Sequence, residues 1–235
     1  MQRLVINPTQ KQEEVITLTD AQQHYLHRVL RLEAGDRFVA ISGEGEGWVA
    51  EIQGNHAIAI DILALSLTEL PVAVTLMIAL PKGNGFDEVV RHCTELGVTT
   101  LMPIISTRSL LNPSDKKLER WRRIAEEATE QSERQIVPTI TDTIEFTTAL
   151  EVISSQPANR YICTARGDAS HFLNCLETAQ DIVIAVGCEG GWTQEEIENA
   201  IAQKFQPVSL GRRILRTITA PMVAMSIVAA TLEKD

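Results

Sequence analysis

The first part of the chain consists of short apolar runs separated by polar turns. The runs predict strands over residues 3–6, 15–18, 36–42, 48–53 and 56–63, with a helix starting near Asp20 between the second and the third. Glycine-containing turns at 33–36 and 43–47 separate the later strands. A series of short strands of this kind predicts a small barrel or sandwich.

A polar segment, 66–71, ends in Pro71 and marks a change of pattern. Beyond it the sequence predicts strands over 72–80, 99–105, 161–163 and 182–186, and helices over 84–96, 114–135, 193–203 and 220–232. Apolar runs that alternate with helical patterns are typical of a parallel sheet covered by helices. We therefore expect an α/β protein with a small β-rich domain over residues 1–70 and an α/β domain over 71–235.

Composition narrows the class of protein. The chain has 235 residues, of which 44% are hydrophobic, as in an ordinary globular protein. The first residues do not resemble a targeting segment, and no apolar run is long enough to span a bilayer, so we expect a cytoplasmic protein with no membrane contact. Four widely spaced cysteines, Cys93, Cys163, Cys175 and Cys188, argue against a metal site or a disulfide scaffold and predict buried thiols.

The net charge of −10 argues against indiscriminate nucleic-acid binding. Basic side chains nevertheless share one face of the first predicted helix, at a spacing of i, i+3, i+4 and i+7. They are His24, His27, Arg28 and Arg31. The apolar side of the same helix would carry Tyr25, Val29 and Leu32. The basic face is either an RNA-binding ridge or a solvated helix surface.

Glycines are concentrated directly after the apolar run 182–186, at Gly187, Gly190 and Gly191. They let the backbone approach a ligand where a Cβ atom would clash. Thr193 and Glu196 follow as a capping box, so a strand, a glycine turn and a helix N-terminus form a corner suited to a ligand. A second segment, 210–217, adds another glycine bend and three cations. Together the two segments predict a cofactor site, and a plain turn between strand and helix is the alternative.

The common nucleotide-binding motifs are missing from the sequence. The glycines at 43, 45 and 47 and at 83 and 85 lack the third spacing of a dinucleotide fingerprint, and no phosphate-binding loop ends in Gly-Lys-Ser/Thr. These absences argue against a standard NAD enzyme, a kinase or a GTPase. They also weaken the case for a metabolic enzyme that binds NAD or ATP.

Several motifs, in their order along the chain, match one known family. They are His24-Tyr25-Leu26 with Val29-Leu30-Arg31 and Gly35-Asp36, Pro81-Lys82-Gly83, Thr94 to Val98, Ala125 to Ala128 with Glu130-Gln131-Ser132, Gly187 to Gly191, and Leu210-Gly211 with Ile214 to Thr217. The chain resembles the RsmE family, the small-subunit (16S) ribosomal RNA uracil-N3 methyltransferases of the SPOUT class. The resemblance covers nearly the whole chain.

This resemblance implies an N-terminal PUA-like barrel that helps to hold RNA and a C-terminal SPOUT domain with a trefoil knot. The knot would form the S-adenosylmethionine pocket and a homodimer interface. The implied pocket residues are Val186, Gly187, Glu189, Gly190, Leu210, Gly211, Ile214, Leu215 and Arg216. The implied RNA contacts are His24, His27, Arg28, Arg31 and Lys82, and the substrate would be small-subunit ribosomal RNA or the assembled subunit.

The chemistry of this reaction fits such a pocket. The methyl sulfonium is already a good electrophile, so the protein mainly positions it and excludes water. Ile214, Leu215 and backbone amides would hold the adenine. Uracil N3 must lose a proton, and Arg216 is the candidate cation for the negative charge that develops on the ring. The sequence identifies no general base.

Four positions depart from the usual family pattern. Cys188 stands where proline is usual, Ile218 where glutamate is usual, Gly85 near the place of a basic residue, and His92 where lysine is common. The loss of a carboxylate at Ile218, together with the acidic charge, motivates an alternative function. In that alternative the chain is a catalytically inactive RNA-binding or ribosome-assembly factor that retains the methyltransferase fold.

Overall fold

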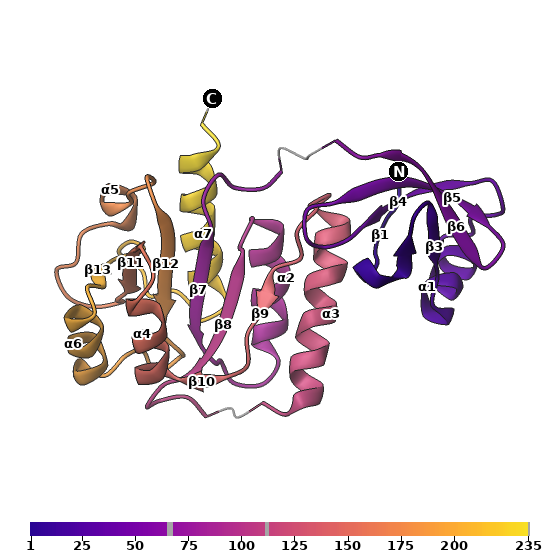
Figure 1. Ribbon diagram of the computed structural model, residues 1–235. Helices are drawn as coiled ribbons and strands as arrows, with labels where there is room; N and C mark the ends of the chain where they lie inside the picture. The colour runs from indigo at the N-terminus through magenta and orange to yellow at the C-terminus, as the bar shows by residue number, and fades with distance from the viewer. Residues whose placement is uncertain (65–67, 111–112, 235) are drawn as a thin grey trace. The chain divides into compact units, whose positions relative to one another are not determined.

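A computed structural model describes residues 1–64, 68–110 and 113–234. Residues 65–67, which include part of the predicted boundary segment 66–71, lie outside the described residues. The backbone divides into two compact units (Figure 1). One comprises Met1–Glu69 with Glu126–Val137, and the other comprises Leu70–Ala125 with Pro138–Asp235. The chain thus passes from one unit to the other within a single long helix, near residue 125.

The N-terminal unit contains one mixed sheet with the strand order β1-β4-β5-β6-β3-β2. Its strands are β1 (Arg3–Val5), β2 (Lys11–Gln12), β3 (Val15–Thr17), β4 (Arg37–Ile41), β5 (Gly47–Gln53) and β6 (His56–Ile62). β1 pairs with β4 in parallel, and the other neighbours are antiparallel. Alternate residues such as Phe38, Ala40, Ala50 and Ile52 form the buried core. The sequence predicted these strands except β2, whose two polar residues carry no apolar pattern.

The first predicted helix is shorter than expected. The α-helix α1 (Asp20–His24) continues as a single π-helical turn, η2 (Tyr25–Val29), in which the N–H of Leu30 donates to the carbonyl of Tyr25 at 2.9 Å. Arg31 follows in the left-handed region, with φ of 59°. The prediction that His24, His27, Arg28 and Arg31 share one helical face is therefore wrong, because the 3.6-residue period ends before Arg31.

The same turn changes which side chains are buried. Leu26 is fully buried, while Tyr25, Leu30 and Leu32 pack against the core only in part. Val29 was predicted on the apolar side, yet it is 58% exposed. The wider turn rotates Val29 away from the sheet.

The second unit is built on a parallel sheet, as the sequence predicted, with the order β10-β8-β7-β12-β11-β13 and β9 beside β8. Its strands are β7 (Val74–Ala79), β8 (Thr100–Ile105), β9 (Thr139–Ile140), β10 (Ile144–Glu145), β11 (Ala158–Cys163), β12 (Asp181–Val186) and β13 (Gln206–Val208). β9, β10 and β13 were not predicted, because two or three residues give no readable period. Since all pairs are parallel, the carboxyl ends of the strands lie at one edge.

Helices accompany this sheet (Figure 1). They are α2 (Gly85–Glu95), α3 (Asp115–Gln131), α4 (Phe146–Ser154), α5 (Phe172–Cys175), α6 (Gln194–Ala202) and α7 (Thr219–Leu232). α2 packs on α7, and α4 packs on α6. Met77 and Ala79 of β7 lie in the core with α4 and α6, while Leu76 and Ile78 are also fully buried. Both faces of β7 are therefore covered, as in α/β proteins.

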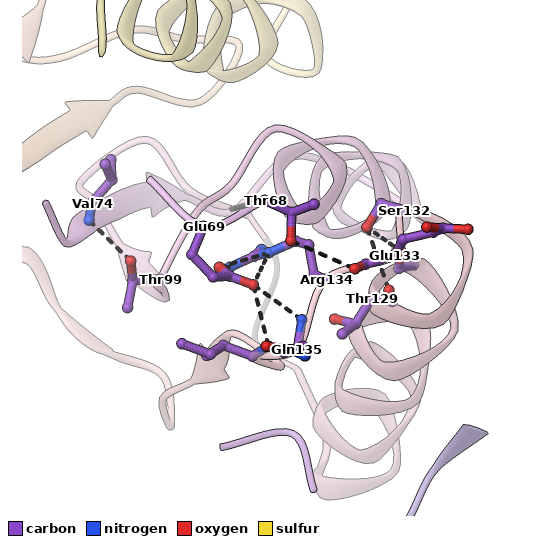
Figure 2. A network of polar contacts seen from close by, with 11 residues as sticks. Thr68, Glu69, Val74, Thr99, Thr129, Ser132, Glu133, Arg134 and Gln135 are labelled. Atoms are coloured by element: carbon purple, nitrogen blue, oxygen red, sulfur yellow. Dashed lines mark hydrogen bonds and ion pairs between the residues drawn. The ribbon is translucent and has the colours of Figure 1, made fainter. Parts of the chain in front are cut away.

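The long helix α3 ends at Gln131, short of the predicted Gln135, and a polar network follows it. Glu133 has a φ of 62°, which ends the helical path. Figure 2 shows the carboxylate of Glu69 between the guanidinium of Arg134 and the backbone of Gln135. Arg134 Nη2 donates to Glu69 Oε2 at 2.7 Å, and the N–H groups of Gln135 and Ile136 donate to Oε1 at 3.2 Å. The Glu69 carboxylate thus holds the segment after α3 within the N-terminal unit.

Glu130, in the last turn of α3, makes stability depend on pH. Its carboxylate accepts the N–H of Val5 at 2.7 Å. Burial raises the pKa of Glu130 to about 7 against that hydrogen bond, and repulsion from Glu126 and Glu127 adds to the rise. The unfolded carboxyl has a pKa near 4.5. The folded state therefore holds the proton more tightly between pH 4.5 and 7, and stability falls as pH rises through this window.

We expect Glu130→Gln to remove most of this pH dependence, because the amide oxygen still accepts from Val5 but carries no charge. The variant should be more stable than the unmodified chain at pH 8, by about 1 kcal/mol after allowing for solvent screening, and similar to it below pH 4.5. Thermal melts across this pH range test the expectation, with Glu119→Gln as the control, because Glu119 is exposed on the same helix and is not among the causes of the Glu130 shift. Parallel pH profiles for Glu130→Gln and the unmodified chain would contradict it.

Candidate functional site

A cavity of about 770 Å³ lies at the carboxyl ends of β11, β12 and β13. Its walls come from the loops that follow these strands, at residues 163–166, 186–192, 210–211, 213–218 and 220, and from Arg108 in the loop after β8. The volume is in the range of small-molecule sites, and the place is where parallel α/β sheets usually bind ligands. The two sequence segments predicted to form one site thus line one cavity.

Every residue predicted for the cofactor pocket lines this cavity. The set comprises Val186, Gly187, Glu189, Gly190, Leu210, Gly211, Ile214, Leu215 and Arg216. Val186 ends β12, and the second group belongs to the loop between β13 and α7. Residues that are more than twenty positions apart in sequence therefore share one wall.

The glycine loop has no room for side chains at two positions. A Cβ atom at Gly190 would lie 2.9 Å from the Cβ and Cδ of Arg108, and one at Gly187 would lie 3.3 Å from the Trp192 ring. Gly191 adopts a φ of 65° and closes a turn through its N–H to the carbonyl of Cys188 at 2.8 Å. The loop therefore requires glycine for its own packing, and this packing leaves its backbone at the cavity wall.

The capping box predicted at Thr193 and Glu196 is confirmed. The Thr193 hydroxyl accepts the N–H of Glu196 at 3.1 Å, and Glu196 Oε2 accepts the N–H of Thr193 at 2.7 Å. Its other oxygen, Oε1, accepts the N–H of Thr107 at 2.8 Å. The buried Glu196 therefore joins the start of α6 to the loop after β8.

Arg108 holds the glycine loop, a role that the sequence did not reveal. Its Nη1 donates to the carbonyl oxygens of Gly190 at 2.6 Å and Trp192 at 3.2 Å. A second contact joins the same two loops, because Ser106 Oγ lies 3.7 Å from Cys188 Sγ. No sequence pattern could have found this pairing, since it joins loops that meet only in the folded sheet.

Thr217 carries an unusual hydroxyl group at the cavity. The residue lines the wall and is 5% exposed, and its Oγ1 has no hydrogen-bond partner among the described residues. A buried hydroxyl without a partner costs free energy. Its Oγ1 is closed off from solvent, so a ligand would reach the hydroxyl only after the side chain turns toward the cavity.

Two departures from the family pattern lie against each other. A Cβ atom at Gly85 would be 3.2 Å from Cδ1 of Ile218, so the isoleucine fills the space beside the glycine. Ile218 also lines the cavity. An apolar contact therefore joins these two positions. Cys188 is buried beside Ser106, and His92 lies between Glu88 and Glu95 on α2, at 3.3 Å from each.

The residues predicted to bind RNA have varied surroundings. His24, Arg28, Arg31 and Lys82 are exposed. His27 instead places Nδ1 2.9 Å from the carbonyl oxygen of Leu32 and Nε2 3.2 Å from that of Gly54. These contacts give His27 a structural role in the N-terminal unit. The backbone N–H of Lys82 donates to Glu189 at 3.2 Å, which leaves the lysine side chain at the edge of the cavity loop.

The four cysteines are free thiols, as expected. Cys93, Cys163 and Cys188 are buried, whereas Cys175 is half-buried. Burial raises the pKa of Cys163 to about 12 and also raises that of Cys93. Across the described ranges, no cluster of histidine, cysteine and carboxylate side chains could hold a metal ion. In the same part of the chain, no helix is both long and apolar enough for a bilayer.

The parallel sheet with its glycine-loop cavity, together with a β-rich unit, defines a class of RNA-modifying enzyme. Residues 68–229 match the family of RNA methyltransferase domains, and residues 18–63 match the PUA domain of RNA methyltransferases. The fold is that of a SPOUT-like methyltransferase. The chain belongs to the RsmE family, the ribosomal RNA small subunit methyltransferase E proteins.

Relatives of this family cover nearly the whole chain. Ribosomal RNA small subunit methyltransferase E of Synechocystis is 47% identical over 98% of this chain and 78% of its own length. The Bacillus subtilis protein of the same name is 31% identical over 99% of this chain and 98% of its own. The Neisseria gonorrhoeae enzyme, solved with bound S-adenosylmethionine, is 31% identical with a TM-score of 0.86 over 98% of both chains.

Proposed function

We propose that this protein is an S-adenosylmethionine-dependent methyltransferase that methylates N3 of a uridine in small-subunit ribosomal RNA. The observation that carries the proposal is one cavity lined by residues of both predicted segments, 186–192 and 210–217. The cavity fits the cofactor by its volume and by its glycine backbone.

Residues of this chain would divide the work of the reaction. The cofactor supplies an electrophilic methyl group when bound. Backbone groups of Gly187 and Gly190, with the apolar side chains of Ile214 and Leu215, would hold its adenosine part. Arg216 would stabilise the negative charge that develops on the uracil ring as N3 loses its proton. The closed loops around the cavity would exclude water and fix the distance between the reacting atoms.

The division of labour between domains is part of the proposal. Residues 1–70 would act as the PUA-like RNA-binding domain, with His24, Arg28 and Arg31 as exposed contacts, and 71–235 as the methyltransferase domain with Lys82 at its RNA side. The loop 209–218 would complete a trefoil knot around the cofactor. We place the enzyme in the cytoplasm with its ribosomal substrate.

Homodimerisation is supported by the composition of α7. The helix is apolar nearly all round, with the sequence Thr219-Ala-Pro-Met-Val-Ala-Met-Ser-Ile-Val-Ala-Ala-Thr-Leu232. Ala224, Met225 and Val228 are buried within the unit, whereas Met222 and Ile227 remain half-buried. A helix that is apolar on all sides requires a second covering surface. A second copy of the chain would provide that surface.

Thr217→Val tests the cofactor site directly. We expect S-adenosylmethionine affinity to fall about five- to tenfold, because in our account the bound cofactor turns the hydroxyl toward the cavity and forms a hydrogen bond that the variant lacks. Stability without the cofactor should stay the same or rise, since a buried unpaired hydroxyl becomes a methyl group of the same shape. Calorimetry with S-adenosylmethionine, NAD and ATP measures the first effect, and thermal melts measure the second.

Thr217→Ser is the matched control for this variant, because it keeps the hydroxyl and loses only a methyl group. It should bind S-adenosylmethionine close to normally. Equal affinity of Thr217→Val and the unmodified chain would remove Thr217 from the site. Binding of NAD or ATP in preference to S-adenosylmethionine would overturn the proposed function.

A further inference from the structure

Arginine side chains gather at the cavity although the chain as a whole is acidic, with a net charge of −10. Arg108, Arg166, Arg213 and Arg216 all line it, and they come from the loops after β8, β11 and β13. Glu189 also lines the cavity, and its carboxylate already accepts the N–H of Lys82. Convergence of cations from separate loops is a feature of an anion-binding site.

Arg166, Arg213 and Arg216 have no side-chain partner among the described residues, and of these only Arg216 is assigned to the reaction itself. Arg108 is occupied by the carbonyl groups of the glycine loop. Arg166 and Arg213 are exposed, and neither makes a hydrogen bond or an ion pair within the described ranges 1–64, 68–110 and 113–234. By contrast, Arg120 and Arg122 of the same unit each pair with an aspartate. The guanidinium groups of Arg166 and Arg213 are therefore free to bind a ligand.

The ligand chemistry is that of an oxyanion, which a planar guanidinium binds through two parallel hydrogen bonds. Two sources are available at this site: a phosphate of the RNA backbone and the carboxylate of the cofactor's methionine. Exposure favours the phosphate, because both residues line the cavity and are also open to solvent, so a polyanionic strand can reach them from outside. Cations that meet an RNA backbone hold it in register without reading its sequence.

We infer that Arg166 and Arg213 bind the RNA phosphates next to the target uridine and so present its base to the cavity. The inference rests on the proposed function. The two arginines would give the second unit its own RNA contacts, separate from those of the N-terminal unit. Both residues position the RNA, whereas Arg216 acts on the uracil ring that reacts.

The test compares Arg166→Ala and Arg213→Ala with Arg212→Ala. Arg212 is the matched control, because it is an exposed neighbour in the same loop that does not line the cavity. A small-subunit ribosomal RNA fragment is titrated with each full-length variant at several salt concentrations, and S-adenosylmethionine binding is measured by calorimetry. Thermal melts check that each variant is folded.

We expect each of the two cavity variants to lose about five- to tenfold in RNA affinity, and the slope of log affinity against log salt to shrink by about 0.7 to 0.9. S-adenosylmethionine affinity should stay within about twofold of normal, and Arg212→Ala should match the unmodified chain. Lysine at either position should restore the salt slope, because it keeps the charge.

Other outcomes overturn the inference in distinguishable ways. RNA affinity and slope equal to those of Arg212→Ala would show that the two arginines form a solvated rim. Loss of S-adenosylmethionine binding with normal RNA binding would assign the pair to the cofactor carboxylate. If the unmodified chain binds no RNA at all, the proposed function fails, and the inference that rests on it fails too.

Discussion

Replacing Arg216 with alanine is expected to lower the rate of methyl transfer by about a thousandfold. Arg216 lines the cavity and is exposed, and its side chain forms no hydrogen bond or ion pair within the described part of the chain. The fold of the single chain therefore does not depend on its side chain. The reaction does depend on it in our account, because the uracil ring gains negative charge as the bond to the methyl group forms.

Single-turnover rates with saturating S-adenosylmethionine and RNA measure this effect apart from binding. Arg212→Ala, one loop position outside the cavity lining, is the control and should react at the normal rate. Arg216→Lys should retain part of the rate, since it keeps a cation without the planar fork. A normal rate for Arg216→Ala would exclude Arg216 from the chemistry.

Replacing Glu69 with alanine is expected to cost about 3 kcal/mol of stability. Arg134 is only 2% exposed, and Glu69 is its carboxylate partner. The substitution also removes the acceptor for the backbone N–H groups of Gln135 and Ile136. A buried charge that loses its counterion is far more costly than an exposed one.

Thermal melts at neutral pH check this prediction, with a fall in Tm of roughly 6–12 °C for a chain of this size. Asp142→Ala is the matched control, because it breaks the exposed Arg122–Asp142 pair and should cost less than about 1 kcal/mol. The fall in Tm for Glu69→Gln should lie between those of the other two variants, since its amide oxygen still accepts hydrogen bonds. A shift for Glu69→Ala no larger than that for Asp142→Ala would refute the role of the network.

The sequence revealed elements whose period was long enough to read. β12 and the capping box at Thr193 stood out because an apolar run led directly into a glycine turn and a helix start. α3 was found but placed four residues too long, since only the left-handed Glu133 marks its end. α4 was missed, and the π turn after His24 was read as a regular helix. A 3.6-residue pattern cannot show a local change of helix type.

The parts of the site that lie in continuous sequence could be predicted, whereas the parts that depend on contacts between distant loops could not. The two glycine-containing segments could be recognised separately, and they line one cavity. Arg108 and Arg166 could not, because loops that follow different strands meet only at the edge of the finished sheet. Thr217 stood in a recognised motif, yet its unpaired hydroxyl is a property of packing. Glu126–Val137 likewise joins the N-terminal unit through tertiary contacts, among them those with Glu69, Val5 and Gly43.

The most direct test of the account is transfer of labelled methyl from S-adenosylmethionine to small ribosomal subunits that lack the modification, followed by mass spectrometry of the digested RNA. We predict one methyl group on N3 of a single uridine, which would also show that Ile218 is compatible with catalysis. No transfer, with S-adenosylmethionine and RNA both still bound, would contradict the account and favour an inactive assembly factor with the same fold.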